Sequence, residues 1–282
     1  MADPTAVLGD LRDEGEDLDR LVSTAGYGQW TLPTPADGWT VAHQIAHLAW
    51  TDERALLSAT DPAAFARDAA RALSSPETFV DDGTEEIVAA YEKDPAGLRA
   101  RWRDSRRALS EALAAQPPGA RLPWYGPPMS VASMATGRLM ETWAHGQDVA
   151  DALGVRREPT GRLRHVVRIG VRARDYAFGA RGLVPPEEEF RVELTAPDGE
   201  SVWEYGPRDA AQRVTGPALD FCLLATQRAH RSDLALRAEG ADADLWLDIA
   251  QAFAGPPGKG RLPATPPTGL PGEGRTGPGP GA

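Results

Sequence analysis

The sequence predicts an α+β protein, with an N-terminal four-helix bundle followed by a small C-terminal α+β domain. Two observations support this fold class. Up to residue 158, long segments repeat apolar residues at the three- and four-residue spacing of amphipathic helices. After Pro159, short segments alternate apolar and polar residues as half-buried strands do. Because 282 residues are enough for two ordinary domains, we expect the bundle at residues 1–158 and the α+β domain at residues 159–254.

Six helices are expected in the first domain. Four long ones would form the bundle, at 5–24, 41–57, 97–115 and 130–153. Two shorter helices are expected at 61–75 and 83–93. Thr40 stands where the N-cap of the second long helix should be, and Gly154 follows the fourth as a helix-ending glycine does.

The second domain should combine short strands with helices. We expect helices at 161–180, 217–227 and 243–253, and strands at 190–194, 201–205, 213–215 and 234–239. The first two strands flank the turn Ala196-Pro-Asp-Gly-Glu200 and should form a hairpin. Residues 255–282 contain 9 glycines and 8 prolines. Such a composition buries too little apolar surface to become ordered, so we expect a disordered Pro/Gly-rich tail there.

The overall composition excludes several classes of protein. With 41% hydrophobic and 25% charged residues, the chain has the balance of a soluble globular protein. Its net charge of −11 opposes binding to nucleic acid or to acidic membranes, and we expect neither as a partner. Cys222 is the only cysteine, so neither an intrachain disulfide nor a thiolate-rich metal site can form. No secretory signal or membrane-spanning apolar run is present, and we expect a cytoplasmic protein.

Two of the long helices carry lines of polar side chains that suggest chemistry. The residues of the second helix that share an arc of roughly 60° are His43, His47, Trp50 and Arg54. The residues of the fourth helix that share an arc of roughly 80° are Arg138, Glu141, His145 and Asp148. A solvent-facing helix would show the same pattern. The fourth helix, however, is apolar on its remaining faces, so we expect it to be buried, and a buried polar line must be ion-paired or bind metal.

The spacing of these residues indicates a divalent metal site. Glu141 and His145 lie one helical turn apart and point the same way, as metal ligands of bundle proteins do. His47 from the facing helix would complete three ligands, the usual number when zinc keeps a position open for water or substrate. His43 shares the face of His47, so the helical wheel alone does not select three ligands among the four candidates.

Three segments at these positions carry a family resemblance. They are Gly38-Trp-Thr-Val-Ala-His-Gln-Ile-Ala-His-Leu-Ala49, Glu141-Thr-Trp-Ala-His-Gly-Gln-Asp148 and Trp246-Leu-Asp-Ile-Ala-Gln-Ala-Phe-Ala-Gly-Pro-Pro257. Together they resemble the mycothiol-dependent maleylpyruvate isomerase and DinB-like superfamily of four-helix metalloproteins, in an actinobacterial metal-binding subgroup. The resemblance covers about residues 5–257. It implies a DinB-like bundle with His47, Glu141 and His145 as the ligands, and it makes His43 a neighbour of the ligands.

The resemblance also implies a chemistry for the site. A zinc ion on two imidazoles and one carboxylate lowers the pKa of a bound water or thiol. In the family, the thiol is a low-molecular-weight cofactor such as mycothiol, which either adds reversibly across a conjugated double bond or transfers its sulfur to an electrophile. Cys222 lies in an apolar helix and is expected to be inert core filling. The expected partners are therefore a small thiol and a small-molecule substrate.

Other charged residues have two interpretations each. Asp148 could accept the free ring N–H of a ligating histidine, or it could be a surface acid. Arg138 could bind a substrate carboxylate or neutralise Glu141. Arg228 and Arg231, which flank His230, could close a cleft over a carboxylate, or they could form a solvated basic cluster.

The leading hypothesis is a metal-dependent enzyme that uses a small thiol for isomerisation or S-transfer on an electrophilic substrate, with Arg138 and Asp148 as its catalytic candidates. One alternative is a non-catalytic protein that binds metal or a small ligand. The other alternative is a metal-dependent hydrolase, with water in the open coordination position.

Overall fold

Capping residues mark the ends of several helices in the N-terminal half of the chain. Asp61 and Asp94 each accept a hydrogen bond from a backbone N–H in the first turn of a helix, and a proline occupies the first position of both helices. Gly154 ends the last bundle helix with φ 67°, a left-handed conformation that favours glycine. Local sequence therefore determines the limits of the helices.

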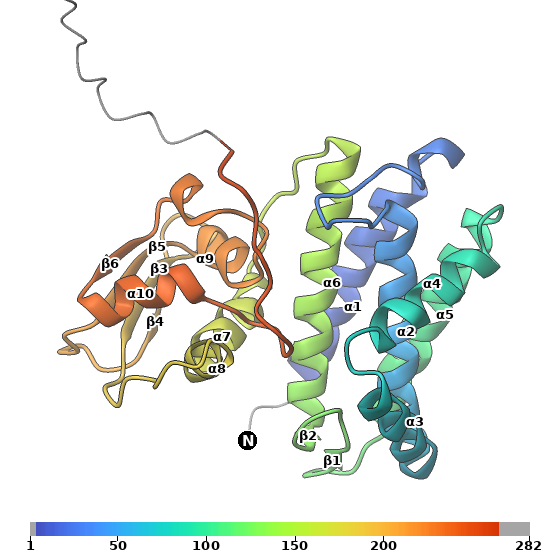
Figure 1. Cartoon of the computed structure of the whole chain (residues 1–282), viewed down its shortest axis with the longest axis horizontal. Helices are drawn as coiled ribbons and strands as arrows, with labels where there is room; N and C mark the ends of the chain where they lie inside the picture. The colour runs from blue at the N-terminus through green and yellow to red at the C-terminus, as the bar shows by residue number, and fades with distance from the viewer. Residues whose placement is uncertain (1–3, 265–282) are drawn as a thin grey trace, which may run out of the picture.

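The computed structural model describes residues 4–264 and confirms the predicted α+β fold class (Figure 1). The helices of its N-terminal half are α1 (Pro4–Ser23), α2 (Val41–Thr60), α3 (Pro62–Ser74), α4 (Phe79–Ala90), α5 (Pro95–Ala114) and α6 (Val131–Leu153), with a short 3-10 turn at Tyr27–Gln29. Helices α1, α2, α5 and α6 pack against one another as the bundle, and α3 and α4 lie against α2. None of the helices in the described part is long and apolar enough to cross a membrane.

Helix α6 is buried on almost every side. Leu139 and Trp143 belong to the core that the helix shares with the C-terminal domain, whereas Met134 and Val149 belong to two cores inside the bundle. A helix placed between two domains loses its solvent face. Its polar side chains are therefore held inside the protein, where each of them needs a partner.

The C-terminal domain is a mixed sheet with helices. Its elements are α7 (Leu163–Arg172), α8 (Arg174–Ala180), β3 (Arg191–Thr195), β4 (Val202–Tyr205), β5 (Arg213–Pro217), α9 (Ala218–Ala225), a 3-10 turn (Arg231–Asp233), β6 (Arg237–Glu239) and α10 (Ala241–Ile249). The strand order is β4-β3-β5-β6, with β3 and β5 parallel and the other pairs antiparallel. Val192, Val214, Phe221 and Trp246 join the sheet and its helices in one core.

Several details differ from the sequence-based expectations, among them a helix at Phe79–Ala90 where 83–93 was expected and a strand at Arg237–Glu239 where 234–239 was expected. The helix expected at 161–180 is interrupted at Ala173, which lets Val167 of α7 and Phe178 of α8 enter the same core. The segment between α5 and α6, expected to contain only turns, includes two short paired strands, β1 (Arg121–Leu122) and β2 (Met129–Ser130). The last helix ends at Ile249 because Ala250 has an extended conformation (ψ 133°).

The segment that follows α10 returns toward the bundle. Residues 265–282 of the predicted tail lie outside the described residues. Residues 255–264 are described, and within them Arg261 forms an ion pair with Asp148 of α6 and donates a hydrogen bond to the carbonyl of Pro35. This part of the chain thus bridges α6 and the loop before α2.

Candidate metal centre

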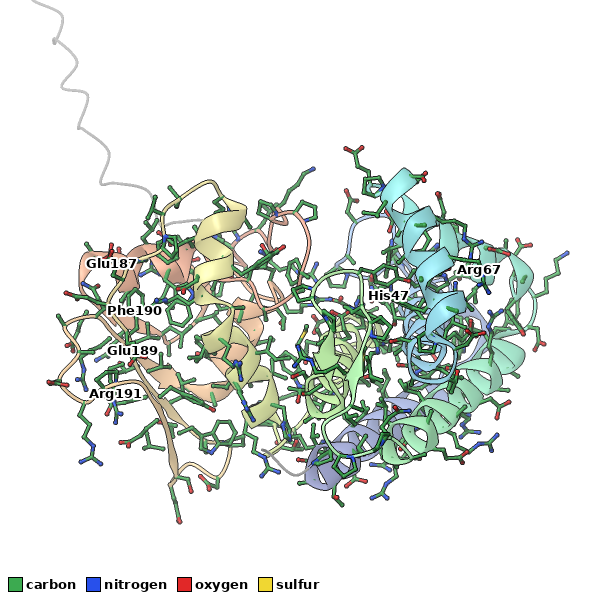
Figure 2. The ribbon with its side chains drawn as sticks, turned by 90° about the horizontal axis from the view of Figure 1, so that it is seen from below. His47, Arg67, Glu187, Glu189, Phe190 and Arg191 are labelled. Carbon is green, nitrogen blue, oxygen red and sulfur yellow. The ribbon has the colours of Figure 1, made fainter. Side chains whose placement is uncertain are left out.

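His47 of α2 and Glu141 and His145 of α6 converge at one point between the two helices. The Nε2 atoms of His47 and His145 lie 3.3 and 3.2 Å from the same Glu141 oxygen, Oε2. One ligand atom from each of the three residues lies within 4.8 Å of the others. Figure 2 shows His47 among the bundle helices, far from Phe190 and Arg191 of the C-terminal domain. The structure therefore brings together the three residues that the sequence indicated as ligands.

The loop before α2 places an indole ring against the two imidazoles. The Trp39 ring centroid lies 5.2 Å from that of His47 and 5.9 Å from that of His145. Gly38, with φ 76°, takes up the left-handed conformation that brings the loop to this position. Trp39 thus covers one side of the centre and limits the approach of water there.

A directional chain of hydrogen bonds fixes the proton of His145. The Thr34 hydroxyl donates to the Trp39 carbonyl (2.9 Å), and it therefore accepts from Gln44 Nε2 (2.8 Å). This orientation leaves Gln44 Oε1 to accept the Nδ1 proton of His145 (2.5 Å). The Nε2 of a neutral His145 then carries only a lone pair, which is the state that a metal ligand requires.

The charge state of the site fits a cation. Burial lowers the pKa of His145 to about 4, assisted by the nearby His47, so its ring is neutral at pH 7. Burial acts to raise the pKa of Glu141, but a hydrogen bond that His47 donates from its Nε2 to Glu141 Oε2 acts against burial, and the pKa lies well below its usual range. An ionised carboxylate therefore faces the lone pair on the Nε2 of His145. A divalent cation stabilises such an arrangement of electron-pair donors, and two imidazoles with one carboxylate are a donor set that zinc accepts.

His43 does not join the three converging residues, although the helical wheel places it on the same face of α2 as His47. Its Nδ1 accepts the backbone N–H of Thr40 at 3.2 Å, and its Nε2 contacts Glu85 Oε1 at 3.0 Å. Both ring nitrogens thus have partners, one before the start of α2 and the other on α4. This geometry excludes His43 from the three converging residues and selects among the candidates that the sequence left open.

Asp148 is fully buried, which rules out the surface-acid interpretation, and His145 is not among its hydrogen-bond partners in the described part of the chain. Its two oxygens are bound by Arg228, at 2.8 Å, and by Arg261. Gln44 occupies the hydrogen-bonding position beside His145 that one of the two interpretations gave to Asp148. Residue spacing did not indicate these two arginines as partners of Asp148, because Arg228 follows α9 and Arg261 follows α10.

The predicted cluster around His230 is divided in the structure. Gln227 has φ 60°, a left-handed conformation that is uncommon outside glycine, and it directs the chain so that Arg228 reaches Asp148. Arg231 instead pairs with Asp244 and Asp248 at the surface. Arg228 is thus bound to a carboxylate of the protein itself, whereas Arg231 belongs to a surface ion-pair cluster.

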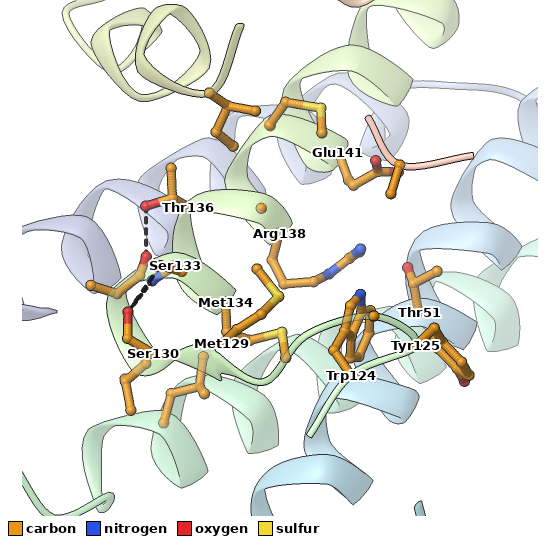
Figure 3. Close-up of a pocket in the computed structure, with 18 of the residues that line it drawn as sticks. Thr51, Trp124, Tyr125, Met129, Ser130, Ser133, Met134, Thr136, Arg138 and Glu141 are labelled. Atoms are coloured by element: carbon orange, nitrogen blue, oxygen red, sulfur yellow. Dashed lines mark hydrogen bonds between the residues drawn. The ribbon is translucent and has the colours of Figure 1, made fainter. Parts of the chain in front are cut away.

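Arg138 is buried and forms an ion pair with Asp52 of α2, its Nε lying 2.8 Å from Asp52 Oδ1. Burial raises the pKa of Asp52 despite the attraction of Arg138. The Nη2 of Arg138 has no hydrogen-bond partner in the described part of the chain. Figure 3 shows the guanidinium pointing toward Thr51 and Trp124 at the pocket. Sequence reasoning identified Arg138 but missed Asp52, whose spacing from the histidines carries no signal.

The three candidate ligands open onto a cleft of about 2110 Å³ that is also lined by Arg138 and Arg228. Access from this side leaves room at the metal position for a molecule from solution. Fold and site together thus define a helical-bundle protein that has a three-residue candidate metal centre at the junction with an α+β domain.

Comparison with known proteins agrees with this description. The family model described as "Mycothiol maleylpyruvate isomerase N-terminal domain" matches residues 11–150, and a model described as "Wyosine base formation" matches residues 186–239. Two proteins from two strains of Mycobacterium tuberculosis, both called uncharacterized, are 57% identical over 261 residues, which are 93% of this chain and 100% of theirs. Residues 11–150 belong to the family described as mycothiol maleylpyruvate isomerase N-terminal domain, and the chain as a whole belongs to one family with the two mycobacterial proteins.

Solved structures show the same fold. The crystal structure of the mycothiol-dependent maleylpyruvate isomerase has a TM-score of 0.55 and 16% sequence identity, and the match covers 84% of this chain and 92% of that chain. A histidine-to-alanine variant of the isomerase has a TM-score of 0.54 at the same identity and coverage. At this identity the likeness concerns the fold.

Proposed function

We propose that this protein is a metal-dependent enzyme, with zinc as its metal, that uses a mycothiol-like thiol for isomerisation or S-transfer on a small electrophilic substrate. The observation that carries the proposal is the centre formed by His47, Glu141 and His145, with three ligands and one side open to the cleft. When bound, the metal supplies a positive charge that lowers the pKa of a coordinated thiol, so that the thiolate can form near neutral pH.

The thiol of this reaction comes from outside the chain. Cys222 is fully buried in α9, and burial raises the pKa of its thiol well above the usual range. It also donates a hydrogen bond to the Leu163 carbonyl, at 3.7 Å. A cysteine in this state is neither ionised nor accessible, which supports a cofactor from solution.

The residues around the centre have distinct roles in the proposal. Gln44 holds the His145 ring in the ligating tautomer. Arg138, with its unpartnered Nη2, binds an anionic group of the substrate. Asp148 acts as a positioning residue, because it holds Arg228 at the cleft.

The proposed reactions are balanced without a further reactant. In isomerisation, the thiol forms a C–S bond at one alkene carbon, and the other alkene carbon receives the π electrons and the thiol proton. After rotation, the reverse elimination returns the thiol unchanged. In S-transfer, the C–S bond would form as the leaving group departs with its electron pair, and the thiol proton would go to the leaving group.

Thiol titration of the cobalt-substituted protein tests this function. We expect saturable binding of a small thiol that changes the visible spectrum of the cobalt ion, and we expect no change with an alcohol of the same shape. A protein that binds cobalt stoichiometrically, but whose spectrum no thiol alters, would contradict the proposal and favour a non-catalytic metal-binding role. A rate with simple esters that a chelator abolishes would instead indicate hydrolysis.

A further inference from the structure

Four aromatic side chains line one side of the cleft. Trp50 belongs to α2, Phe79 begins α4, and Trp124 and Tyr125 lie in the loop between β1 and β2. Their ring centroids are 5.2 Å apart for Trp50 and Phe79, 5.7 Å for Phe79 and Tyr125, and 5.0 Å for Tyr125 and Trp124. These four residues, which we call the aromatic wall, form an unbroken chain of edge-to-face contacts.

Buried charges hold the aromatic wall in place. The Tyr125 hydroxyl donates a hydrogen bond to Asp68, at 2.7 Å, and Asp68 is almost fully buried. Arg54 pairs with the same carboxylate and lies over the Trp50 ring, 5.3 Å from its centroid. The rings are thus fixed before any ligand arrives, and little conformational entropy is lost when a flat apolar molecule packs against them.

The mouth of the cleft on this side is also apolar. Leu73 of α3 and Val80 of α4 line it and are 81% and 39% exposed. Large apolar side chains that gather at a concave, exposed surface are typical of a ligand-binding groove. The chemistry of this face therefore matches an apolar molecule.

Arg138 lies between the aromatic wall and the metal centre. Its side chain is only 4% exposed, and its Nη2 has no partner in the described part of the chain. Figure 3 shows it pointing toward Trp124. It precedes Glu141 by three residues on α6, a rise of about 4.5 Å along the helix. A carboxylate held by Arg138 would thus lie about one helical turn from the ligands, with the aromatic wall beside it.

The cleft has room for a substrate with a substantial apolar body. Its volume is about 2110 Å³, whereas pockets for drug-sized ligands measure roughly 300–1,000 Å³. We propose that the substrate is a carboxylic acid with an aryl or similarly extended apolar group, whose carboxylate binds Arg138 and whose apolar body packs against the aromatic wall. This assignment of the substrate class rests on the proposed function for its reaction, and its binding can be measured without that reaction.

Calorimetric titration of the zinc-loaded full chain tests this binding. The probes are trans-cinnamate, an aryl acid, and fumarate, a small diacid without an apolar body. We expect cinnamate to bind at least tenfold more tightly than fumarate. Trp124→Ala should weaken cinnamate binding at least fivefold and leave fumarate unchanged, whereas Arg138→Gln should weaken both. Trp203→Ala, at a partly buried tryptophan in β4 of the C-terminal domain, is the matched control and should change neither.

Saturation-transfer NMR on the unmodified chain tests cinnamate binding without any variant, so the inference can be tested even if a variant does not fold. We expect the ring protons of cinnamate to receive saturation from the protein. Equal affinities for the two acids, no saturation transfer, or a folded Trp124→Ala variant with unchanged cinnamate affinity would overturn the inference. If cinnamate binds as expected but thiols leave the cobalt spectrum unchanged, the proposed function fails and the acid site stands. If thiols change the cobalt spectrum but cinnamate does not bind as expected, the acid site is rejected and the proposed function stands.

Discussion

The Nδ1 of His145 on α6 donates a hydrogen bond to the Oε1 of Gln44 on α2, at 2.5 Å. Gln44 is fully buried, and its amide group is oriented by Thr34. Helix α2 therefore contributes to the centre twice: it carries His47, and through Gln44 it determines which nitrogen of His145 faces the metal position.

Removal of this hydrogen bond should weaken metal binding while the ligands stay in place. We expect Gln44→Leu to lower zinc affinity about 10- to 100-fold, the usual cost of losing a partner of a ligating histidine. Competition with a chromophoric chelator measures the affinity. Gln147→Leu is the matched control, because Gln147 also lies on α6 but donates its hydrogen bond to Asp151 at the surface. An unchanged affinity in Gln44→Leu would show that the tautomer is fixed in another way.

Substitution of the converging residues should abolish stoichiometric metal binding. We expect His47→Ala and Glu141→Gln to purify with little zinc, since two ligands hold the ion far less tightly than three. His43→Ala should keep the full amount, because both ring nitrogens of His43 are engaged elsewhere. Elemental analysis of the four proteins, wild type included, decides the matter. A loss of zinc from His43→Ala alone would contradict the assignment.

The fully buried Asp148 should be important for stability. Asp148→Ala leaves the guanidinium groups of Arg228 and Arg261, which are 15% and 19% exposed, without their common carboxylate. We expect the free energy of unfolding to fall by about 3–5 kcal/mol. Denaturant titration measures this loss. Asp151→Ala, at an exposed acid one turn further along α6, should cost less than about 1 kcal/mol. Similar losses in the two variants would argue against the special role of Asp148.

Asp19 of α1 should make stability depend on acid pH. Burial acts to raise its pKa, but hydrogen bonds from Arg103 and Arg99 of α5 outweigh this and hold the pKa below the ordinary value of 3.8. The unfolded state therefore binds a proton at higher pH than the folded state does. The stabilisation is complete above about pH 4 and is lost as the pH falls through the lowered folded-state pKa.

Two measurements check the effect of Asp19. Asp19→Asn should lower the free energy of unfolding at pH 7 by about 2–3 kcal/mol, because hydrogen bonds to a charged partner are lost. The difference from wild type should shrink as the pH falls below 4. A difference that stays constant down to pH 2 would mean that the charge of Asp19 does not stabilise the fold.

Much of this protein follows from local sequence. The apolar periodicity and the capping residues gave the α+β fold class and nearly every helix, because these signals act within one or two turns. The one-turn spacing of Glu141 and His145 likewise predicted that their side chains would meet. The zinc identity and the limits of the domains stay predictions.

Tertiary structure decided the remaining features of the site. Two histidines on one face of α2 are equivalent on a helical wheel, and only the packing of α2 against α6 brings His47 to Glu141 while His43 turns to Glu85. The partners of Arg138 and Asp148 lie about 80 or more residues away along the chain. Such contacts depend on how helices and domains pack, and residue spacing along the chain does not predict that packing. Burial on both sides of α6 then makes each of those contacts obligatory.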